Sequence, residues 1–413
     1  MQALGCHPTT WESIGSCDRP SIVIGITHPE TCLVLPERIR VLKAAGFRVV
    51  IISSPGTLLN EIAISEGVDV APVSMERGVA PLADVASLIR LCRVLKQLQP
   101  SMTEFSTPKA GLLGNLAAKL CRIPTRVYLL RGLRLETLSG LKRRLLLSAE
   151  RIAAASAHHV LCNSKSLRAK ALKLGIAPPE KLHVLGGGSS QGVDTERFSP
   201  GPEMVRRSLR IPNDCPVIGF VGRLTCDKGI PELLQAFERI LQKVPEARLL
   251  LVGWFDESDD ALSEAVRRHI MTHAQILYTG FVADTAPYYR AMDLMVLPTW
   301  REGFPNVVLE AGSTGIPVVA THSTGACDSV LPEVTGLLIP AGYPEAIAEA
   351  VIRLIRNPDE RFRMGRAARE WVITRFVNEH VLGLTVDFYK KLLQPPNREE
   401  AGAVVMDGPA VAD

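Results

Sequence analysis

The sequence lacks the features that would place the chain across or outside a membrane. None of its apolar runs reaches the roughly 18 residues that a membrane span needs. The first twenty residues include Trp11, Glu12 and Asp18 instead of the apolar centre of a signal peptide. The nine cysteines are an odd number without C-x-x-C spacing, which indicates reduced thiols and excludes a disulfide framework or a zinc site. We therefore expect a cytoplasmic protein.

A dinucleotide-binding glycine fingerprint is also missing. Nicotinamide and flavin folds carry G-x-G-x-x-G directly after their first strand. Here the first apolar run, residues 21–27, continues into His28, Pro29 and Glu30. The sequence therefore predicts no such cofactor.

The length and the charge distribution indicate two unlike halves. A chain of 413 residues exceeds what one core usually serves, so two domains are expected. Residues 1–200 contain 25 Lys and Arg against 15 Asp and Glu, whereas residues 201–413 contain 22 against 28. The net charges of +10 and −6 suggest that the first half meets an anionic partner or surface, and we expect no nucleic acid.

Strand and helix patterns alternate through both halves. Short apolar runs rich in β-branched residues are separated by amphipathic segments, as in parallel sheets covered by helices on both faces. Residues 186–188 are three glycines, and a Pro- and Gly-containing linker follows them up to Pro212, which makes this the candidate hinge. The fold class predicted is therefore α/β, with two doubly wound parallel sheets.

The stretch 293–320 combines two buried strands with a loop and a helix. Residues 293–298 and 316–320 have strand character, and Pro305 suits the first turn of the helix between them. The loop 299–304 therefore leaves the carboxyl end of a parallel strand and enters a helix N-terminus, where α/β sheets bind ligands and free amides favour anions.

Two carboxylates, Glu302 and Glu310, bracket this turn eight positions apart. On an arbitrary helix they would be solvated surface acids, because Glu is seldom buried. Their apolar flanks favour a site instead. A carboxylate offers only acceptors, so the natural partner is a ligand that carries hydroxyl groups, such as a sugar.

A glycine-bounded turn follows the strand at residues 217–221. It reads Gly222-Arg223-Leu224-Thr225-Cys226-Asp227-Lys228-Gly229. Glycine at both ends lets the backbone approach a ligand, while Arg223 and Lys228 can close on a diphosphate as a fork and a point charge. A strand followed by a glycine turn is common, so this signal is weak on its own.

These motifs together resemble the E-x7-E signature and the G-R-x-x-x-x-K-G turn of the retaining nucleotide-sugar glycosyltransferases of family 4. The resemblance implies that Glu302 meets the hydroxyls of the donor sugar and Glu310 meets the ribose. It also implies that Arg223 and Lys228 hold the diphosphate. It assigns the intervening turn, with Gly303, Phe304, Asn306 and Val307, to contacts with the sugar and the diphosphate. It assigns a second segment, Gly280, Phe281 and Val282, to contacts with the nucleobase.

The resemblance covers residues 21–393 and implies two Rossmann-like domains that face each other across a cleft. We expect a loose lead-in over residues 1–20, an acceptor-binding domain over 21–199 and a donor-binding domain over 200–376. A helix over 377–394 should cross back to the first domain. The polar, Pro- and Gly-punctuated residues 395–413 should be disordered.

A further motif concerns the acceptor side. Residues 107–114, TPKAGLLG, are similar to the subgroup that builds capsular, lipopolysaccharide and glycan-linkage polysaccharides on polyprenyl diphosphate carriers. Lys109, Arg131 and Arg134 are the candidate acceptor residues, although Lys109 could equally lie on a solvated helix face. Arg131 and Ser106 stand where many relatives carry histidines, so neither histidine role is transferred.

The resemblance predicts a retaining glycosyltransferase that uses a UDP-sugar in preference to a GDP-sugar. The acceptor would be a lipid-linked or polysaccharide chain. Glu302, Arg223 and Lys228 are the predicted catalytic residues, and no metal is expected, with Asp259 and Asp260 assigned to a helix start away from the diphosphate. A nucleotide-sugar 2-epimerase of the same architecture and an inactive nucleotide-sugar-binding protein are the alternatives.

One basic, leucine-rich segment suggests attachment to a membrane. Residues 122–151 contain eight Lys or Arg but only Glu136 and Glu150, and leucines recur through the segment. Core packing explains part of this pattern. A basic leucine-rich helix also lies flat in an anionic interface, so we expect peripheral contact with the inner face of the cytoplasmic membrane.

Overall fold

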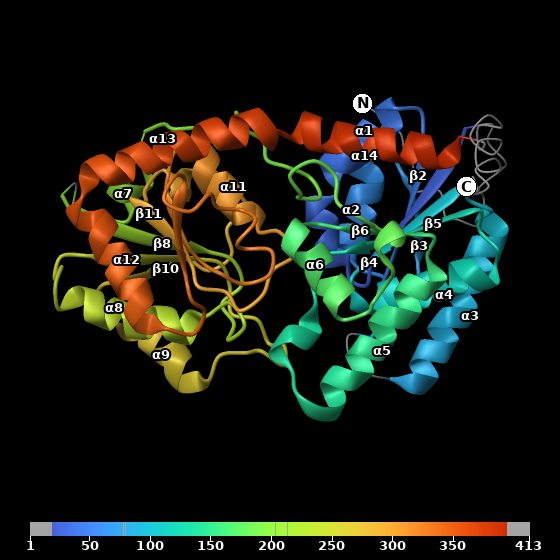
Figure 1. Cartoon of the computed structure of the whole chain (residues 1–413), viewed down its shortest axis with the longest axis horizontal. Coiled ribbons are helices and arrows are strands. Elements are labelled where there is room, and N and C mark those ends of the chain that lie inside the picture. The colour runs from blue at the N-terminus through green and yellow to red at the C-terminus, as the bar shows by residue number, and fades with distance from the viewer. Residues whose placement is uncertain (1–18, 77, 79, 203, 213, 395–413) are drawn as a thin grey trace, which may run out of the picture.

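The computed structural model describes residues 19–394, except residues 77, 79, 203 and 213. The chain forms two lobes, each built on a parallel sheet with helices on both faces (Figure 1). The expectation of two Rossmann-like α/β domains is therefore confirmed.

The first sheet has seven strands in the order β3-β2-β1-β4-β5-β6-β7, and every pair is parallel. Their apolar residues are buried on both faces, which explains the continuous apolar runs in the sequence. The strands are β1 (Ser21–Gly25), β2 (Arg48–Ser53), β3 (Asp69–Pro72), β4 (Met102–Ser106), β5 (Thr125–Leu130), β6 (His159–Cys162) and β7 (Leu182–His183).

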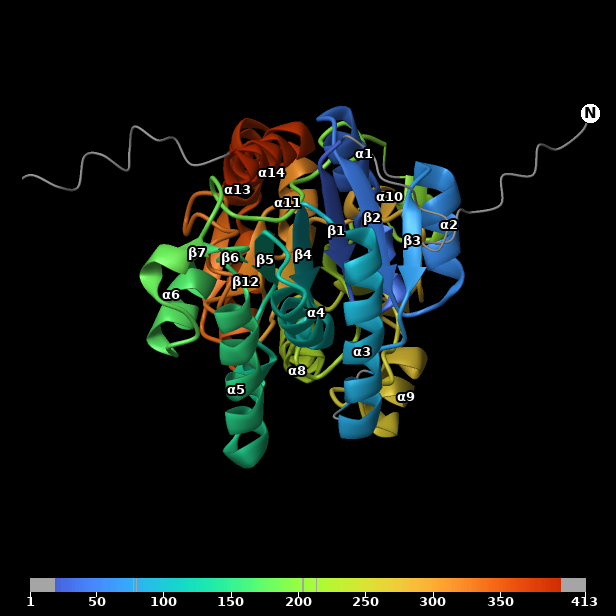
Figure 2. The same ribbon diagram turned by 90° about the vertical axis from the view of Figure 1, so that its right-hand side faces the viewer.

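Helices cover both faces of this sheet. They are α1 (Pro36–Ala44), α2 (Thr57–Glu66), α3 (Pro81–Leu98), α4 (Pro108–Leu120), α5 (Gly140–Ser156) and α6 (Lys165–Lys173). Short 3₁₀ turns occupy Pro29–Val34, Arg134–Thr137 and Pro179–Lys181. Helix α4 lies between α3 and α5 and contacts both, and Figure 2 shows α3 and α5 projecting on the same side of the domain.

The second sheet has six parallel strands in the order β10-β9-β8-β11-β12-β13. They are β8 (Val217–Val221), β9 (Arg248–Val252), β10 (Ile276–Tyr278), β11 (Leu294–Leu297), β12 (Val318–Thr321) and β13 (Gly336–Ile339). The helices are α7 (Met204–Ser208), α8 (Ile230–Leu241), α9 (Glu264–Thr272), α10 (Ala286–Tyr289), α11 (Asn306–Ser313), α12 (Pro344–Arg356) and α13 (Pro358–Arg375).

The C-terminal helix α14 (Asn378–Leu393) returns to the first lobe. Figure 1 shows α13 and α14 following one another along one side of both lobes, with α14 beside α1. Val386 and Tyr389 are buried in the core of the first domain, and Arg38 on α1 donates a 2.7 Å hydrogen bond to the Tyr389 hydroxyl. The chain therefore contributes to the first domain from both of its ends.

Both sheets reverse their strand order at one point, between β1 and β4 and between β8 and β11. In open parallel sheets, ligands bind outside the carboxyl ends of the strands at such a switch point. The loops that follow β8 and β11 are the Arg223 turn and the Glu302 turn. The two donor motifs, about 80 residues apart in sequence, therefore emerge side by side.

Candidate functional site

The Arg223 turn is fitted closely against the strand that carries the Glu302 turn. Gly229 has a φ of +73°, and a Cβ atom there would lie 2.1 Å from the Pro298 carbonyl oxygen. Only glycine fits this close approach without moving the backbone. Gly229 thus ends the turn, holds it beside β11 and begins α8 directly after Lys228.

The two predicted diphosphate cations each pair with a carboxylate. The Lys228 ammonium forms an ion pair with Glu302, and both side chains are mostly buried. The Arg223 Nη1 atom lies 2.7 Å from Asp256 Oδ2. Burial alone would raise the pKa of Asp256, but hydrogen bonds from Arg223 and Ser258 outweigh it and lower that pKa.

A third ion pair, which the sequence does not predict, joins Asp227 of the Arg223 turn to Arg301 of the Glu302 turn. The buried carboxylate of Asp227 accepts a 2.6 Å hydrogen bond from Thr225 and lies 2.8 Å from Arg301 Nη2. Burial would raise the pKa of Asp227, but Thr225 and Arg301 outweigh it and lower that pKa. The Asp227 carbonyl also accepts from the Trp300 amide at 2.9 Å, so Asp227 joins the two turns.

Glu310 lies on α11, the helix that follows the Glu302 turn, and its partner is a tyrosine and not a cation. The Tyr289 hydroxyl, fully buried, donates a 2.6 Å hydrogen bond to Glu310 Oε2. Burial raises the pKa of Glu310, and the hydrogen bond from Tyr289 opposes this only in part. The bond fixes one carboxylate oxygen, and the other has no hydrogen-bond partner among the residues that the structure describes, which suits a carboxylate that accepts from a ligand hydroxyl.

The turn between the two glutamates packs against the first domain. A Cβ atom on Gly303 would lie 1.9 Å from the Arg131 carbonyl oxygen, so this position needs glycine. Phe304 is buried, and Asn306 Oδ1 accepts a 3.1 Å hydrogen bond from Ser189. Pro305 is the residue before α11 and not part of its first turn, so the helix begins one residue later than expected.

The predicted nucleobase segment follows β10 at the same edge of the sheet. Gly280 has a φ of +70°, and its carbonyl accepts from the Gly253 amide at 3.1 Å. Phe281 is 60% exposed and makes an edge-to-face contact with Trp254 at 5.6 Å between ring centroids. Val282 packs partly against the core. An exposed aromatic pair here is available for a planar ligand.

The first-domain face of the cleft contains a buried group of charges. Glu104, fully buried on β4, forms an ion pair with buried Arg38. Arg131 follows β5, and its Nε atom is buried without a hydrogen-bond partner among the described residues. Burial and repulsion by Arg38 lower the pKa of Arg131 to about 10, against the attraction of Glu104. Arg38 therefore forms the ion pair with Glu104, and Arg131 forms none among the described residues.

The other two predicted acceptor residues do not gather beside Arg131. Lys109 at the start of α4 lies 2.6 Å from Asp84 on α3, so it is neither a solvated lysine nor a free cation. Arg134 lies 2.7 Å from Asp259 across the cleft. Asp259 precedes α9, which begins only at Glu264, so the expected helix start is wrong. The neighbouring Asp260 lies 3.7 Å from Arg301.

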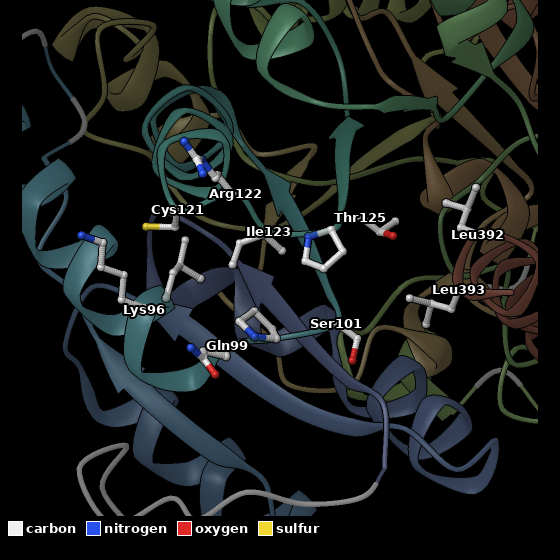
Figure 3. A pocket seen from close by; sticks show the side chains of 12 residues that line it. Lys96, Gln99, Ser101, Cys121, Arg122, Ile123, Thr125, Leu392 and Leu393 are labelled. Carbon is white, nitrogen blue, oxygen red and sulfur yellow. The ribbon is translucent and has the colours of Figure 1, made fainter. Parts of the chain in front are cut away.

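A cavity of about 830 Å³ lies at the opposite edge of the first sheet, outside the cleft. Its lining includes Ser101 and Thr125, which stand at the amino ends of β4 and β5. Figure 3 shows Lys96 and Arg122 across the cavity from Leu392 and Leu393. None of the predicted site residues lines it, so it is separate from the arrangement above.

Within residues 19–394, apart from the four gaps, no group of three or more His, Cys, Asp or Glu side chains is placed to hold a metal ion. No helix in the same part of the chain is long and apolar enough to cross a membrane.

Both halves of the sequence match described protein families. Residues 36–188 match the family described as "Glycosyl transferase 4-like domain", and residues 215–357 match "Glycosyl transferases group 1". The chain is 33% identical over 374 residues to the capsular polysaccharide biosynthesis glycosyltransferase CapM of Staphylococcus aureus, covering 89% of this chain and 96% of CapM. It is 26% identical over 284 residues to the UDP-Gal:alpha-D-GlcNAc-diphosphoundecaprenol alpha-1,3-galactosyltransferase of Escherichia coli, covering 67% and 72% of the two chains.

Solved structures share the fold at lower sequence identity. The Anabaena protein HepE, crystallised with UDP and glucose, superposes with a TM-score of 0.72 at 20% identity, covering 90% of this chain and 98% of HepE. The sucrose-phosphate synthase of Thermosynechococcus elongatus superposes with a TM-score of 0.74 at 20% identity, covering 91% and 99%. The two-domain arrangement is therefore shared over nearly the whole chain.

Proposed function

Because the chain belongs to the family 4 glycosyltransferases, we propose that it transfers a sugar with retention from a UDP-sugar to a lipid-linked or polysaccharide acceptor. The observation that carries this proposal is the convergence of Arg223, Lys228 and Glu302 at the switch point of the second sheet, facing the first domain. Two cations at this edge of the sheet can stabilise a diphosphate as it leaves, and the carboxylate beside them can hold the sugar.

In the proposed reaction, the bond between the anomeric carbon and the diphosphate oxygen breaks and a bond to an acceptor oxygen forms on the same face. The acceptor hydroxyl proton passes to the departing diphosphate. Arg223 and Lys228 would neutralise the negative charge that grows on that diphosphate, without a metal ion. Glu302 would orient the sugar. The amides of Gly303 and of its neighbours at the start of α11 would favour the negatively charged diphosphate of the donor.

The Lys228–Glu302 ion pair adds an order of events to this proposal. A diphosphate that takes Lys228 must replace Glu302 as its partner. Exchange of partners would release the Glu302 carboxylate for the sugar hydroxyls at the moment the donor binds. Glu310 would meanwhile accept from the ribose, and Gly280, Phe281 and Val282 would meet the base.

The substrate classes rest on the relatives. HepE was crystallised with UDP, and the Escherichia coli relative is a UDP-Gal transferase that acts on a diphosphoundecaprenol carrier. CapM belongs to capsular polysaccharide biosynthesis. These names favour UDP over GDP and a polyprenyl-diphosphate acceptor. Arg131 would be the cation that meets the acceptor.

The experiment incubates the full chain with a panel of UDP- and GDP-sugars and an undecaprenyl-diphosphate-linked sugar, and mass spectrometry follows the lipid. A lipid that is heavier by one sugar, with release of UDP, is the expected result, and NMR of the new linkage should show retained configuration. Epimerised donor without a change in the lipid would indicate the 2-epimerase alternative. Donor binding without either product, across the whole panel, would indicate an inactive binding protein.

We also propose that helices α3 and α5 hold the first domain at an anionic membrane. Leu141 is 78% exposed and Leu145 half-exposed, beside the exposed cations Lys142 and Arg144, whereas Leu146 and Leu147 pack towards the core. The leucines of this segment therefore divide between the two explanations given by the sequence.

Helix α3 adds apolar residues on the same side. Leu82 is 89% exposed, and Val85 and Ile89 follow it at helical spacing, also exposed. Both helices project from the same side of the domain (Figure 2). The exposed apolar residues of α3 and the basic helix α5, on the same side of the domain, match the chemistry of an anionic lipid surface, with each cation contributing on the order of 1 kcal/mol.

Sedimentation with anionic vesicles tests this attachment. Replacing Lys142, Arg143 and Arg144 with Gln should reduce binding, and added salt should reduce binding of the parent, because exposed charges are screened. The matched control replaces three exposed second-domain cations, Arg356, Arg363 and Arg366. Equal binding of both triple variants and the parent would contradict attachment through these three cations.

A further inference from the structure

The two domains are joined at the cleft by hydrogen bonds that end on the Glu302 turn. We propose that Ser166, Asp328, Thr324 and Glu136 form a cross-domain latch that positions Glu302 for sugar transfer. The residues of the latch are positioning residues and need not touch the substrate. The inference rests on the proposed role of Glu302, and its test separates the two.

The first connection of the latch lies at the N-terminus of α6. The Ser166 amide donates to Asp328 at 3.1 Å and 3.3 Å, and the Ser166 hydroxyl donates to the same carboxylate. The side chain of Ser164 caps the helix by accepting from the Leu167 amide. A carboxylate on the free amide and hydroxyl of a helix N-terminus forms charge-assisted hydrogen bonds, which are stronger than neutral ones. Helix α6 belongs to the first domain and Asp328 to the second, so this contact spans the cleft.

The same hydroxyl continues the connection to the Glu302 turn. The Ser166 hydroxyl oxygen accepts a 2.8 Å hydrogen bond from the Gly325 amide. Gly325 has a φ of +78°, and a Cβ atom there would lie 2.5 Å from the Gly303 carbonyl oxygen and 2.6 Å from that of Glu302. The Asp328 loop therefore lies directly against the backbone of the turn, and a shift of one moves the other.

A second connection runs parallel to the first. The Glu302 amide donates to the Thr324 carbonyl at 2.9 Å, and the Thr324 hydroxyl donates to Glu136 at 2.7 Å. Glu136 lies in the first domain and is held by Lys170 of α6 at 3.2 Å. Two connections therefore join α6 to the Glu302 turn: one runs through Ser166 to Gly325, which packs on the turn, and the other runs through Glu136 and Thr324 to the Glu302 amide.

The position of Glu302 thus depends on contact between the domains. Lys228 and Arg223 depend less on that contact, because their turn follows β8 and is held by the packing of Gly229 on Pro298 within the second domain. Opening of the cleft would break the bonds of Ser166 and Thr324 and leave the diphosphate cations in place. The latch would then allow the donor to bind to either state and permit transfer only in the closed one.

The test compares Ser166→Ala, Asp328→Ala, the double variant and the rescue variant Ser166→Thr. Each single substitution should lower kcat about tenfold, the loss expected for a hydrogen bond to a charged group, and leave UDP affinity within about twofold. The double variant should fall no further than Ser166→Ala alone, because both substitutions remove the same interaction. Ser166→Thr, which keeps the hydroxyl, should recover most of the lost kcat.

Two further measurements keep the inference falsifiable. Small-angle X-ray scattering of the ligand-free variants should show a larger radius of gyration than the parent. Thr324→Val, which breaks only the second connection, should also lower kcat. Glu345→Gln is the matched control, since it breaks an exposed ion pair with Arg239 within the second domain and should change neither quantity.

Additive losses in the double variant, or an equal loss of UDP affinity and kcat, would overturn the latch. If scattering showed opening while kcat stayed at the parent's value, the positioning of Glu302 by the latch would be wrong, although the contact between the domains would stand. If kcat fell without any change in scattering, closure by the latch would be wrong. A chain that transferred no sugar in any form would contradict the proposed function, and scattering would still report on the latch.

Discussion

The two faces of the cleft handle charge in opposite ways. On the second-domain face, each of the cations Arg223, Lys228 and Arg301 has a carboxylate partner from its own domain. On the first-domain face, Arg38 forms the ion pair with Glu104, and the Nε atom of Arg131 has no hydrogen-bond partner among the described residues.

This difference indicates two modes of anion recognition. A paired cation is already held in position by its carboxylate. When an anionic ligand replaces that carboxylate, the cation needs little reorganisation. An underpaired, mostly desolvated cation is destabilised until an anion reaches it, so its site gains more from binding. We infer that the donor face selects by geometry and the acceptor face by charge.

The largest effect should come from the donor cations. Lys228→Met or Arg223→Met should lower kcat about 10²- to 10³-fold, the range for loss of one preorganised group that stabilises developing charge. The affinity for UDP, measured by calorimetry, should also fall. Lys243→Met, an exposed lysine of the same domain, is the control. Unchanged UDP affinity in both cleft variants would show that the paired cations do not exchange partners.

The buried carboxyl group of Glu150 in the first domain should make the stability of the chain depend on pH. Burial raises the pKa of Glu150 from 4.5 to about 7, against the hydrogen bond from Tyr128. The folded chain therefore binds a proton that the unfolded chain loses between pH 4.5 and 7. Unfolding free energy should fall by about 3 kcal/mol as the pH rises through that window.

Glu150→Gln should remove this loss, because the amide stays neutral and its oxygen still accepts from Tyr128. The variant should be more stable than the parent at pH 8, by up to about 3 kcal/mol in urea unfolding, and close to it at pH 5. Glu61→Gln, at an exposed position on α2, is the control. A constant difference across pH would show that Glu150 is charged in the folded chain.

The acceptor face gives the sharpest contrast with the donor face. Arg131→Gln should raise the KM for the lipid-diphosphate acceptor about 10- to 100-fold, as expected for loss of hydrogen bonds to a charged group. UDP affinity should not change, because the donor cations lie in the other domain. Arg134→Gln should have a smaller effect, since Arg134 is already paired with Asp259. A parallel loss of UDP affinity in Arg131→Gln would break the division between the faces.

The smallest effect separates the two glutamates within the donor face. Glu310→Gln should weaken UDP about tenfold through the ribose, because an amide replaces one of its acceptors with a donor. Glu302→Gln should leave UDP binding equal or stronger, since Lys228 loses its competing partner, and should damage only transfer. Titration calorimetry that finds the same loss of UDP in both would reverse these assignments.

The strands that carry the donor motifs could be predicted from the sequence with small errors. Residues 293–298 and 316–320 contain β11 and most of β12, because strands buried on both faces leave continuous apolar runs. Glu302 and Glu310 could be singled out for the same reason: they interrupt apolar surroundings. Local composition determines such features, so one sequence is enough to find them.

The partners of the charged residues could not be predicted. Lys109 reaches Asp84 and Glu310 reaches Tyr289, and each partner lies on a different element at no characteristic spacing. Asp328 meets Ser166 only because the two domains touch. The pairing of Ser166 with Asp328 joins residues more than 100 positions apart in the sequence. It depends on the packing of the two domains, and no periodic pattern in the sequence predicts it.

The return of α14 to the first lobe has a consequence for how the chain is made. The ribosome releases the first domain before the second, yet Val386 and Tyr389 of the C-terminal helix are part of the first domain's core. Until those residues emerge, Arg38 lacks its contact with the Tyr389 hydroxyl and an apolar surface stays open beside α1. The domain that is synthesised first is therefore completed last, and a chain that stops short of residue 386 leaves it unfinished.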